Sequence, residues 1–283
     1  MTSIELETPD CPLCGSPERR PLYDGPGDGP YAVCACVACG MAFLSPRATE
    51  REMLLLYQRD RYFAGGEDEG YSNYSNQEVP LRRTFRRLLE CMDKGGRTGG
   101  RLLEIGCGYG YFLDEAKPYF ARRVGTDYSS EAVANSRRFA DFVIQGGADD
   151  VGDEEKFDCI VAIHVVEHVY DPRKFVQSLL EKLNSGGSLI LAAPDFGSYW
   201  RKLMGNRWPS FKFPEHVQYF SSETLSRLMG ECGLEGLEGI PYPHAFPLPL
   251  IASKFGLKLP AVFDRFNLWL PSTTVAYVGT KNG

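Results

Sequence analysis

Two groups of residues in this sequence have the types and spacing to do chemistry: cysteines near the N-terminus and histidines in the second half. Five of the nine cysteines fall within the first 40 residues, and four of these form two Cys-x-x-Cys-Gly pairs, CPLCG and CVACG. Such pairs let two thiolates converge on one metal ion. We therefore expect a structural zinc ion bound by the four thiolates of Cys11, Cys14, Cys36 and Cys39.

Other uses of these cysteines stay open at this point. Twenty-one residues separate the two pairs, slightly more than in most zinc ribbons, and Cys34 lies close enough to Cys36 to compete as the fourth ligand. Disulfides or a redox role are the alternatives, and a reducing cytoplasm disfavours disulfides. We expect residues 1–47 to form a small zinc-ribbon domain.

A glycine-rich turn in RLLEIGCGYGYFLDEA, residues 101–116, is a further feature with chemical meaning. An apolar run predicts a buried strand, then Gly106, Gly108 and Gly110 alternate, and a helical pattern starts near residue 111. Glycine permits the tight turn and the close approach of a ligand, and the helix N-terminus offers free amides. A dinucleotide-binding turn would have glycine at residue 111, where this chain has tyrosine, which disfavours a nicotinamide-dependent oxidoreductase.

The complete pattern, Glu104-x-Gly-x-Gly-x-Gly followed by Asp127 at the end of the next strand, VGTD, resembles the first motifs of class I S-adenosylmethionine-dependent methyltransferases. The resemblance implies an α/β fold with a Rossmann-like, seven-stranded, doubly wound sheet whose last strand is antiparallel. It also implies S-adenosylmethionine as the cofactor. Asp127 would accept hydrogen bonds from the ribose hydroxyls, and Glu104 would lie near the methionine amino group.

The segments after the glycine turn alternate between strand and helix patterns, as a doubly wound sheet requires. Strand patterns occur in RRVGTD, FVIQGG, FDCIVAI and SLILAAP, and a last strand is expected at 274–280. We expect residues 99–283 to form the methyltransferase domain and residues 48–98 to form a helical linker with an active-site lid. The expected cofactor contacts are Glu104, Gly106, Gly108, Gly110, Asp127, Tyr128, Ala148, Asp149 and His164.

The string His164-Val-Val-Glu167-His168 also matches the His-x-x-Glu-His motif of one metalloprotease type. A protease needs both histidines on a helix, but here they follow the apolar strand pattern FDCIVAI. We therefore interpret the string as the fourth-strand motif of a methyltransferase, which passes the methionine end of the cofactor and faces the acceptor.

Three of the four histidines fall in segments expected on the acceptor side, and histidine suits the removal of a proton from a hydroxyl or an acidic carbon. PEHVQYFS resembles the segment that supplies a histidine beside the acceptor in sugar and natural-product methyltransferases with an N-terminal zinc knuckle. We expect His216, or else His168, to act as the base, with Glu215 orienting the imidazole. Candidate acceptor contacts are Tyr71, Tyr74, Trp200, Arg207 and Trp208.

The composition fits this interpretation. The chain has 283 residues and a formal net charge of −6, which argues against a general nucleic-acid binder. No apolar run is long enough to span a membrane, and the first residues do not resemble a signal peptide, so a cytoplasmic location is expected. We expect an enzyme that methylates a small molecule, such as a sugar, nucleotide-sugar or natural product. A non-catalytic zinc-ribbon scaffold on the same fold is the other alternative.

Overall fold

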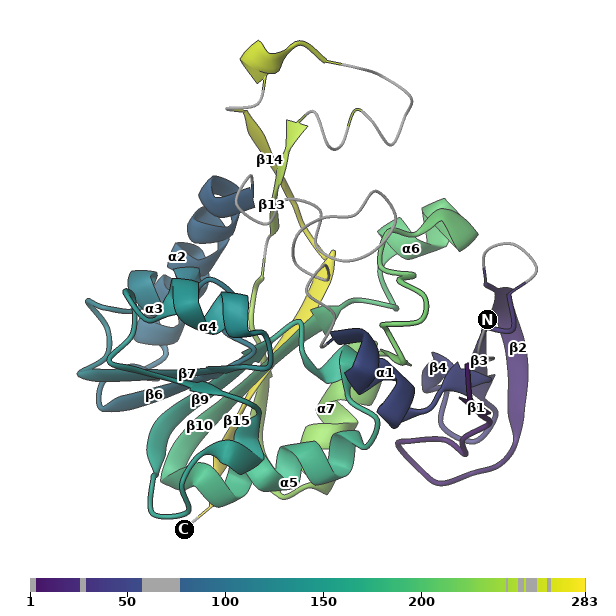
Figure 1. Cartoon of the computed structure of the whole chain (residues 1–283), viewed down its shortest axis with the longest axis horizontal. Coiled ribbons are helices and arrows are strands. Elements are labelled where there is room, and N and C mark those ends of the chain that lie inside the picture. The colour runs from purple at the N-terminus through teal and green to yellow at the C-terminus, as the bar shows by residue number, and fades with distance from the viewer. Residues whose placement is uncertain are drawn as a thin grey trace.

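A seven-stranded sheet forms the centre of the computed structural model, which describes residues 4–25, 29–57, 77–242, 244–248, 252, 259–263 and 266–282. Its strand order is β12-β15-β10-β9-β6-β7-β8 (Figure 1). The bounds are β6 Arg101–Ile105, β7 Arg122–Asp127, β8 Phe142–Gln145, β9 Phe157–Ile163, β10 Leu183–Pro194, β12 Leu234–Gly239 and β15 Thr274–Lys281.

The middle strands of this sheet are buried on both faces, as their apolar sequences predict. Strands β8, β7, β6, β9 and β10 pair in parallel, whereas β15 runs antiparallel to both β10 and β12. The expected seven-stranded methyltransferase sheet with an antiparallel last strand is therefore confirmed. In parallel sheets the carboxyl ends of the strands meet at one edge, which is where ligands bind.

Helices cover both faces of the sheet (Figure 1). On one face lie α2 (Glu78–Lys94), α3 (Tyr111–Glu115) and α4 (Ser130–Ser136), whose apolar residues share a core with β6 and β10. On the other face lie α5 (Pro172–Lys182) and α7 (Ser222–Glu231), which share a second core with β9 and β10. Side-chain caps start α4, α5 and α7: Ser129, Asp171 and Ser221 each accept a hydrogen bond from a first-turn amide.

A second sheet of four strands contains most of the N-terminal region, in the order β11-β4-β3-β2. Its strands are β2 Arg19–Asp24, β3 Ala32–Cys36, β4 Ala42–Leu44 and β11 Gln218–Tyr219, while β1 Leu6–Glu7 pairs separately with β5 Arg47–Ala48. Strand β11 belongs to the second half of the chain, yet Gln218 pairs with Phe43 and Tyr219 with Ala42. The N-terminal region is therefore joined to the rest of the protein by a shared sheet.

The remaining described elements are short helices, strands and 3₁₀ turns. They are α1 Glu50–Tyr57, α6 Tyr199–Met204, β13 His244–Pro247, β14 Asn267–Leu270 and the 3₁₀ turns η2 Ala148–Asp150, η3 Val166–His168, η4 Gly205–Arg207 and η5 Ala261–Phe263. Strands β13 and β14 form an antiparallel pair that projects from the sheet (Figure 1). Within the described ranges, no helix combines the length and apolar character needed to cross a membrane.

Candidate functional site

The glycine turn after β6 forms the floor of the candidate cofactor site. Gly106, Gly108 and Gly110 have φ angles of 69°, 50° and 79°, a region that side chains rarely adopt. A Cβ atom on Gly106 would lie 2.6 Å from Cγ2 of Val165, the second residue after β9. The loop after β9 therefore closes directly over the turn, and both the backbone angle and the available space require glycine at residue 106.

Asp127, at the carboxyl end of β7, lies beside this turn and is only 9% exposed. Its Oδ2 accepts a hydrogen bond from the Gly108 amide and its Oδ1 accepts one from the Ser129 amide, both at 2.9 Å. Burial raises the pKa of this carboxyl group, and the two amides lower it in opposition. Each oxygen keeps a further lone pair, so the fixed carboxylate fits a vicinal diol such as that of a ribose.

Glu104 lies one strand away in the same floor and is 4% exposed. Its Oε2 is buried and has no hydrogen-bond partner among the described residues. Burial, together with the nearby Asp127 charge, raises its pKa well above the ordinary range. A buried acceptor without a donor is costly, and an ammonium group such as that of the cofactor's methionine end would supply one. The residues present therefore fit S-adenosylmethionine.

Three of the other expected cofactor contacts, Tyr128, Ala148 and Asp149, follow β7 and β8. Tyr128 is 66% exposed, and its hydroxyl would be only 2.5 Å from a Cβ on Gly147, so the ring lies over this glycine. Ala148 is buried, whereas Asp149 is exposed. The carboxylate of Asp150, which the sequence motif did not indicate, accepts a hydrogen bond from the Gly147 amide at 2.8 Å. The third-strand end is therefore a rigid turn with exposed carboxylates around it.

His164 directly follows β9 and has a positive φ of 56°, which is strained for a residue other than glycine. Its Nδ1 is 3.2 Å from Oε1 of Glu167, a side chain that is 1% exposed. The His164 ring also lies 6.2 Å from the ring of Tyr242. Burial raises the pKa of Tyr242, and both Glu104 and Glu167 add to this effect. Tyr242, which the sequence did not single out, thus lies beside His164 and within electrostatic range of both Glu104 and Glu167.

His168 and His216 come from distant segments and meet with ring centroids 4.6 Å apart and the rings nearly perpendicular. His216 is 4% exposed, and its Nδ1 lies 2.8 Å from the carbonyl oxygen of Ser210. Burial lowers the pKa of His168, and burial together with His168 and Lys212 lowers the pKa of His216 well below its ordinary value. Both imidazoles are therefore neutral near pH 7, which leaves each a nitrogen lone pair.

The other expected acceptor residues have varied surroundings. Glu215 is 8% exposed beside His216. Trp208 is 5% exposed and packs among Phe196, Phe211 and Tyr219, as a core residue does. The indole of Trp200 donates to the Pro271 carbonyl, and Arg207 is exposed. The expected lid residues, Tyr71 and Tyr74, lie outside the described residues.

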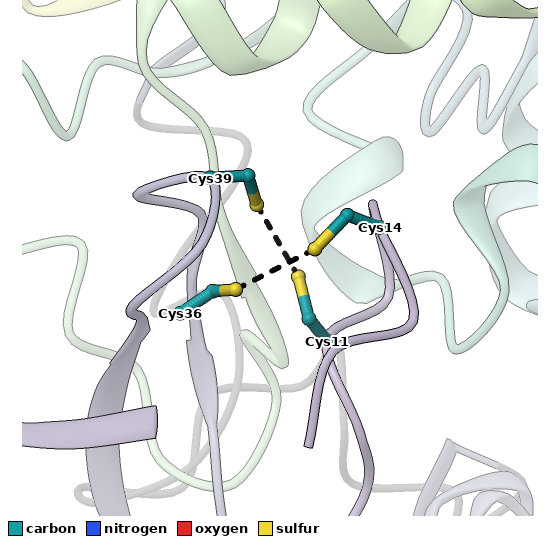
Figure 2. Close-up of side chains that lie close together, drawn as sticks. All are labelled: Cys11, Cys14, Cys36 and Cys39. Carbon is teal, nitrogen blue, oxygen red and sulfur yellow. Dashed lines mark hydrogen bonds between the residues drawn. The ribbon is translucent and has the colours of Figure 1, made fainter. Parts of the chain in front are cut away.

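The four cysteines of the two knuckles point their sulfur atoms at one another (Figure 2). The Sγ atoms of Cys11 and Cys39 are 3.5 Å apart, as are those of Cys14 and Cys36, and all four lie within 4.8 Å of one another. Zinc–sulfur bonds of about 2.3 Å in a tetrahedron would separate the sulfurs by about 3.8 Å. The Cys34 thiol instead faces the Ser45 carbonyl oxygen at 3.4 Å. The arrangement fits a Cys₄ zinc site without Cys34.

Hydrogen bonds connect this cysteine region to the histidine pair. The Leu44 amide donates to the Val217 carbonyl, and the Val217 amide donates to the Glu167 carbonyl, at 3.0 and 2.9 Å. Arg173 on α5 also donates to the Leu13 carbonyl, between the first two cysteines. The segment that contains His216 is therefore held between the ribbon strand β4 on one side and the turn η3 on the other.

Comparisons with known proteins agree with this geometry. A family model described as a methyltransferase domain matches residues 75–238. A protein of Mycolicibacterium smegmatis, named a probable S-adenosylmethionine-dependent methyltransferase, is 27% identical over 70% of this chain and 72% of its own length. The ubiquinone biosynthesis O-methyltransferase of Nitrobacter winogradskyi is 31% identical over 43% of this chain. The chain spans about half the length of that relative, 51%.

Among solved structures, an S-adenosylmethionine-dependent methyltransferase of Thermotoga maritima aligns with a TM-score of 0.54 at 21% identity. The alignment covers 74% of this chain and 94% of that chain, which supports the fold. The expected fold and family are thus confirmed. The family match covers more than half of the chain and includes the glycine turn, Asp127 and the loop after β9. The chain belongs to the methyltransferase-domain family and has the fold of class I S-adenosylmethionine-dependent methyltransferases.

Proposed function

We propose that this protein transfers the methyl group of S-adenosylmethionine to a hydroxyl oxygen or an activated carbon of a small molecule. A sugar, a nucleotide-sugar or a natural product is the expected acceptor class. The observation that carries this proposal is the contact between His168 and His216. His168 belongs to the loop after β9, whose Val165 side chain lies over Gly106 of the glycine turn, and His216 belongs to the segment before β11. The similarity to ubiquinone biosynthesis O-methyltransferases supports oxygen as the methylated atom.

Methyl transfer needs an acceptor atom held in line with the departing sulfur, at about 3 Å from the methyl carbon. The floor residues Glu104, Gly106 and Asp127 would hold the cofactor by its methionine and ribose ends. The neutral imidazoles of His168 and His216 would promote loss of the acceptor's proton. Burial lowers the pKa of His168, and the carboxylates of Glu167 and Glu215 partly oppose this effect.

The Cys₄ group has a structural role in this proposal. Four thiolates complete the coordination of zinc, so a zinc ion bound there would leave no position for water or substrate. Its effect would be to fix the ribbon and, through β4 and β11, the segment that contains His216. A cytoplasmic location agrees with the nine free thiols.

The test combines binding and turnover. Wild-type protein should bind S-adenosylhomocysteine, measured by calorimetry, and should methylate at least one member of a panel of hydroxylated small molecules. His168→Ala and His216→Ala should each lower turnover by about 10² to 10⁴ while S-adenosylhomocysteine affinity changes little.

The fourth histidine provides the matched control, because His244 belongs to β13 and its ring stacks on Phe246. His244→Asn should keep turnover within about threefold of wild type. Full turnover in both His168→Ala and His216→Ala would refute the role of the pair. A protein that binds S-adenosylhomocysteine but methylates no member of a broad panel would favour the non-catalytic scaffold.

A further inference from the structure

Glu167, His168 and His216 form a cluster of metal-ligand type that the transfer of a methyl group does not by itself require. Glu167 and His168 lie in the turn η3, directly after β9, and His216 precedes β11. Ligand atoms of the three side chains all lie within 4.8 Å of one another. Two of the three residues are buried and His168 is half-buried, so the cluster is largely sheltered from bulk water.

The Glu167 carboxylate supplies a second, independent observation. The residue is 1% exposed, and its Oε1 faces His164. Its Oε2 is buried and has no hydrogen-bond partner in the described part of the chain. A carboxylate oxygen in that position requires a positively charged or proton-donating partner. A cation bound between this oxygen and the two imidazoles would provide it.

The hydrogen bond of His216 sets the tautomer that a metal site needs. The Ser210 carbonyl oxygen can only accept, so the Nδ1 atom of His216 carries the proton. The lone pair of the neutral ring is then on Nε2. Metal-binding histidines are commonly held in this way, by donation from the other ring nitrogen to a carbonyl or carboxylate oxygen.

This cluster differs from the protease-type interpretation of His164-x-x-Glu167-His168. Here His164 is not a member of the cluster; its Nδ1 faces Glu167 Oε1 from outside and helps to orient the carboxylate. The third residue, His216, comes from a segment 48 positions further along the chain. The three side chains therefore resemble a two-histidine, one-carboxylate set, which leaves several coordination positions of a cation open.

We propose that Glu167, His168 and His216 bind one divalent first-row metal ion, and that its open positions receive the acceptor's oxygen. The catalytic part of this inference rests on the proposed function. A bound divalent ion supplies Lewis acidity, which lowers the pKa of a hydroxyl that it contacts. As ligands, the two imidazoles would promote loss of the acceptor's proton through the ion and not as bases. The acceptor hydroxyl would lose its proton to water, and its oxygen would then form the O–CH₃ bond as the S–CH₃ bond breaks, the electron pair of that bond staying on sulfur. The proposal thus favours an oxygen acceptor over carbon.

The test uses Mn²⁺, because carboxylate and water oxygens suit it, whereas four thiolates select softer metals such as zinc. Purified full-length protein is treated with a mild chelator under conditions that keep the Cys₄ zinc, which elemental analysis verifies. Mn²⁺ is then titrated and the free ion is followed by its electron paramagnetic resonance signal. Wild type should bind one Mn²⁺ per chain, and its melting temperature should rise with Mn²⁺ concentration.

Three variants and one control sharpen this test. Glu167→Gln, His168→Ala and His216→Ala should each weaken Mn²⁺ binding at least about tenfold, whereas His244→Asn should bind Mn²⁺ as wild type does. Binding of S-adenosylhomocysteine shows that each variant is folded. Wild type that takes up no Mn²⁺ overturns the proposal, whatever the variants do, and so does unchanged binding in all three variants. Mn²⁺ binding does not depend on turnover, so a protein that methylates nothing can still support the metal site.

Discussion

The proposed cofactor floor and the proposed acceptor side are built in different ways. The floor consists of one continuous motif, Glu104 to Gly110, and of Asp127 at the end of the neighbouring strand. The acceptor side is assembled from the turn η3, from the segment before β11 and from the ribbon strand β4. A local sequence motif determines the geometry of the floor, whereas pairing between strands that are distant in sequence determines the geometry of the acceptor side. The two should therefore respond differently to substitution.

Gly106→Val should have the largest effect on the floor. The backbone at residue 106 has a φ of 69°, and the added Cβ would lie 2.6 Å from the Val165 side chain. A β-branched residue strains the backbone and pushes away the loop after β9. We expect S-adenosylhomocysteine affinity to fall by at least about 100-fold, measured by calorimetry, equivalent to about 3 kcal/mol.

Gly152→Ala is the matched control for this substitution. The nearest atom to a Cβ on Gly152 is the Glu155 Cγ at 3.9 Å, an ordinary contact. Its cofactor affinity should match that of wild type. A Gly106→Val protein that retains zinc and also binds S-adenosylhomocysteine normally would show that the turn does not form the cofactor floor.

Cys36→Ser should affect the acceptor side and not the cofactor floor. With one of four thiolates removed, we expect loss of zinc and loosening of the ribbon, because structural zinc sites contribute directly to folding. The pairing of β4 with β11 would weaken, and the segment that contains His216 would lose its support. Turnover should fall by about 100-fold, whereas S-adenosylhomocysteine affinity should stay within about threefold.

Cys34→Ser tests the ligand assignment by the same measurements. The Cys34 thiol faces the Ser45 carbonyl, and a serine hydroxyl can donate to the same oxygen. Zinc content by elemental analysis and turnover should both be retained. If Cys34→Ser loses zinc and Cys36→Ser retains it, Cys34 is a zinc ligand and Cys36 is not. Equal loss of cofactor binding and turnover in Cys36→Ser would contradict the separation of the two sides.

Asp127→Ala should have a smaller effect, confined to cofactor binding. The substitution removes the carboxylate that we propose for the ribose hydroxyls, and also leaves the Gly108 and Ser129 amides without their acceptor. Affinity for S-adenosylhomocysteine should weaken by about 1 to 3 kcal/mol. Zinc content and Mn²⁺ binding should be unaffected. Calorimetry that finds wild-type affinity would refute the ribose assignment.

The sequence predicted the parts of the molecule in which neighbouring residues act together. The sheet, its antiparallel last strand and the glycine turn follow from apolar runs and turn residues within short windows. The convergence of the Cys-x-x-Cys pairs was likewise visible from spacing, and the four sulfurs do meet. In each case a local pattern and the general rules of parallel sheets were enough.

The acceptor side could be predicted only in part, because its contacts join remote segments. Two separate sequence segments indicated His168 and His216 as candidate bases. No pattern in the sequence indicates that β11 joins the sheet of the N-terminal ribbon. In the sequence, Glu167 is notable only as part of the His-x-x-Glu-His string. The burial of its Oε2 atom without a hydrogen-bond partner among the described residues results from the packing around η3, which the sequence does not show. Tyr242 carried no signal at all, since it lies in a proline-rich segment far from both motifs.

Glu104→Gln should have the smallest effect and the most specific signature. Burial, together with the Asp127 charge, raises the pKa of Glu104 in the folded protein. In the unfolded chain the pKa of a glutamate is about 4.3. At pH values between these two pKa values, the folded chain keeps a proton that the unfolded chain has lost. The unfolded state then binds fewer protons, and stability falls as pH rises through this window. Glutamine cannot ionise, so the variant should lack this dependence in denaturant titrations at several pH values.

The ionisation of Glu104 should also be detectable when the cofactor binds. The ammonium of the cofactor's methionine end would favour the ionised carboxylate, so binding below the raised pKa should release a proton, and affinity should increase with pH. Calorimetry in two buffers of different ionisation enthalpy should detect this proton in wild type and not in Glu104→Gln. The variant should bind S-adenosylhomocysteine about tenfold more weakly, as expected for one lost charge-assisted hydrogen bond. Identical proton release in both proteins would assign the titration to another group and remove Glu104 from the cofactor floor.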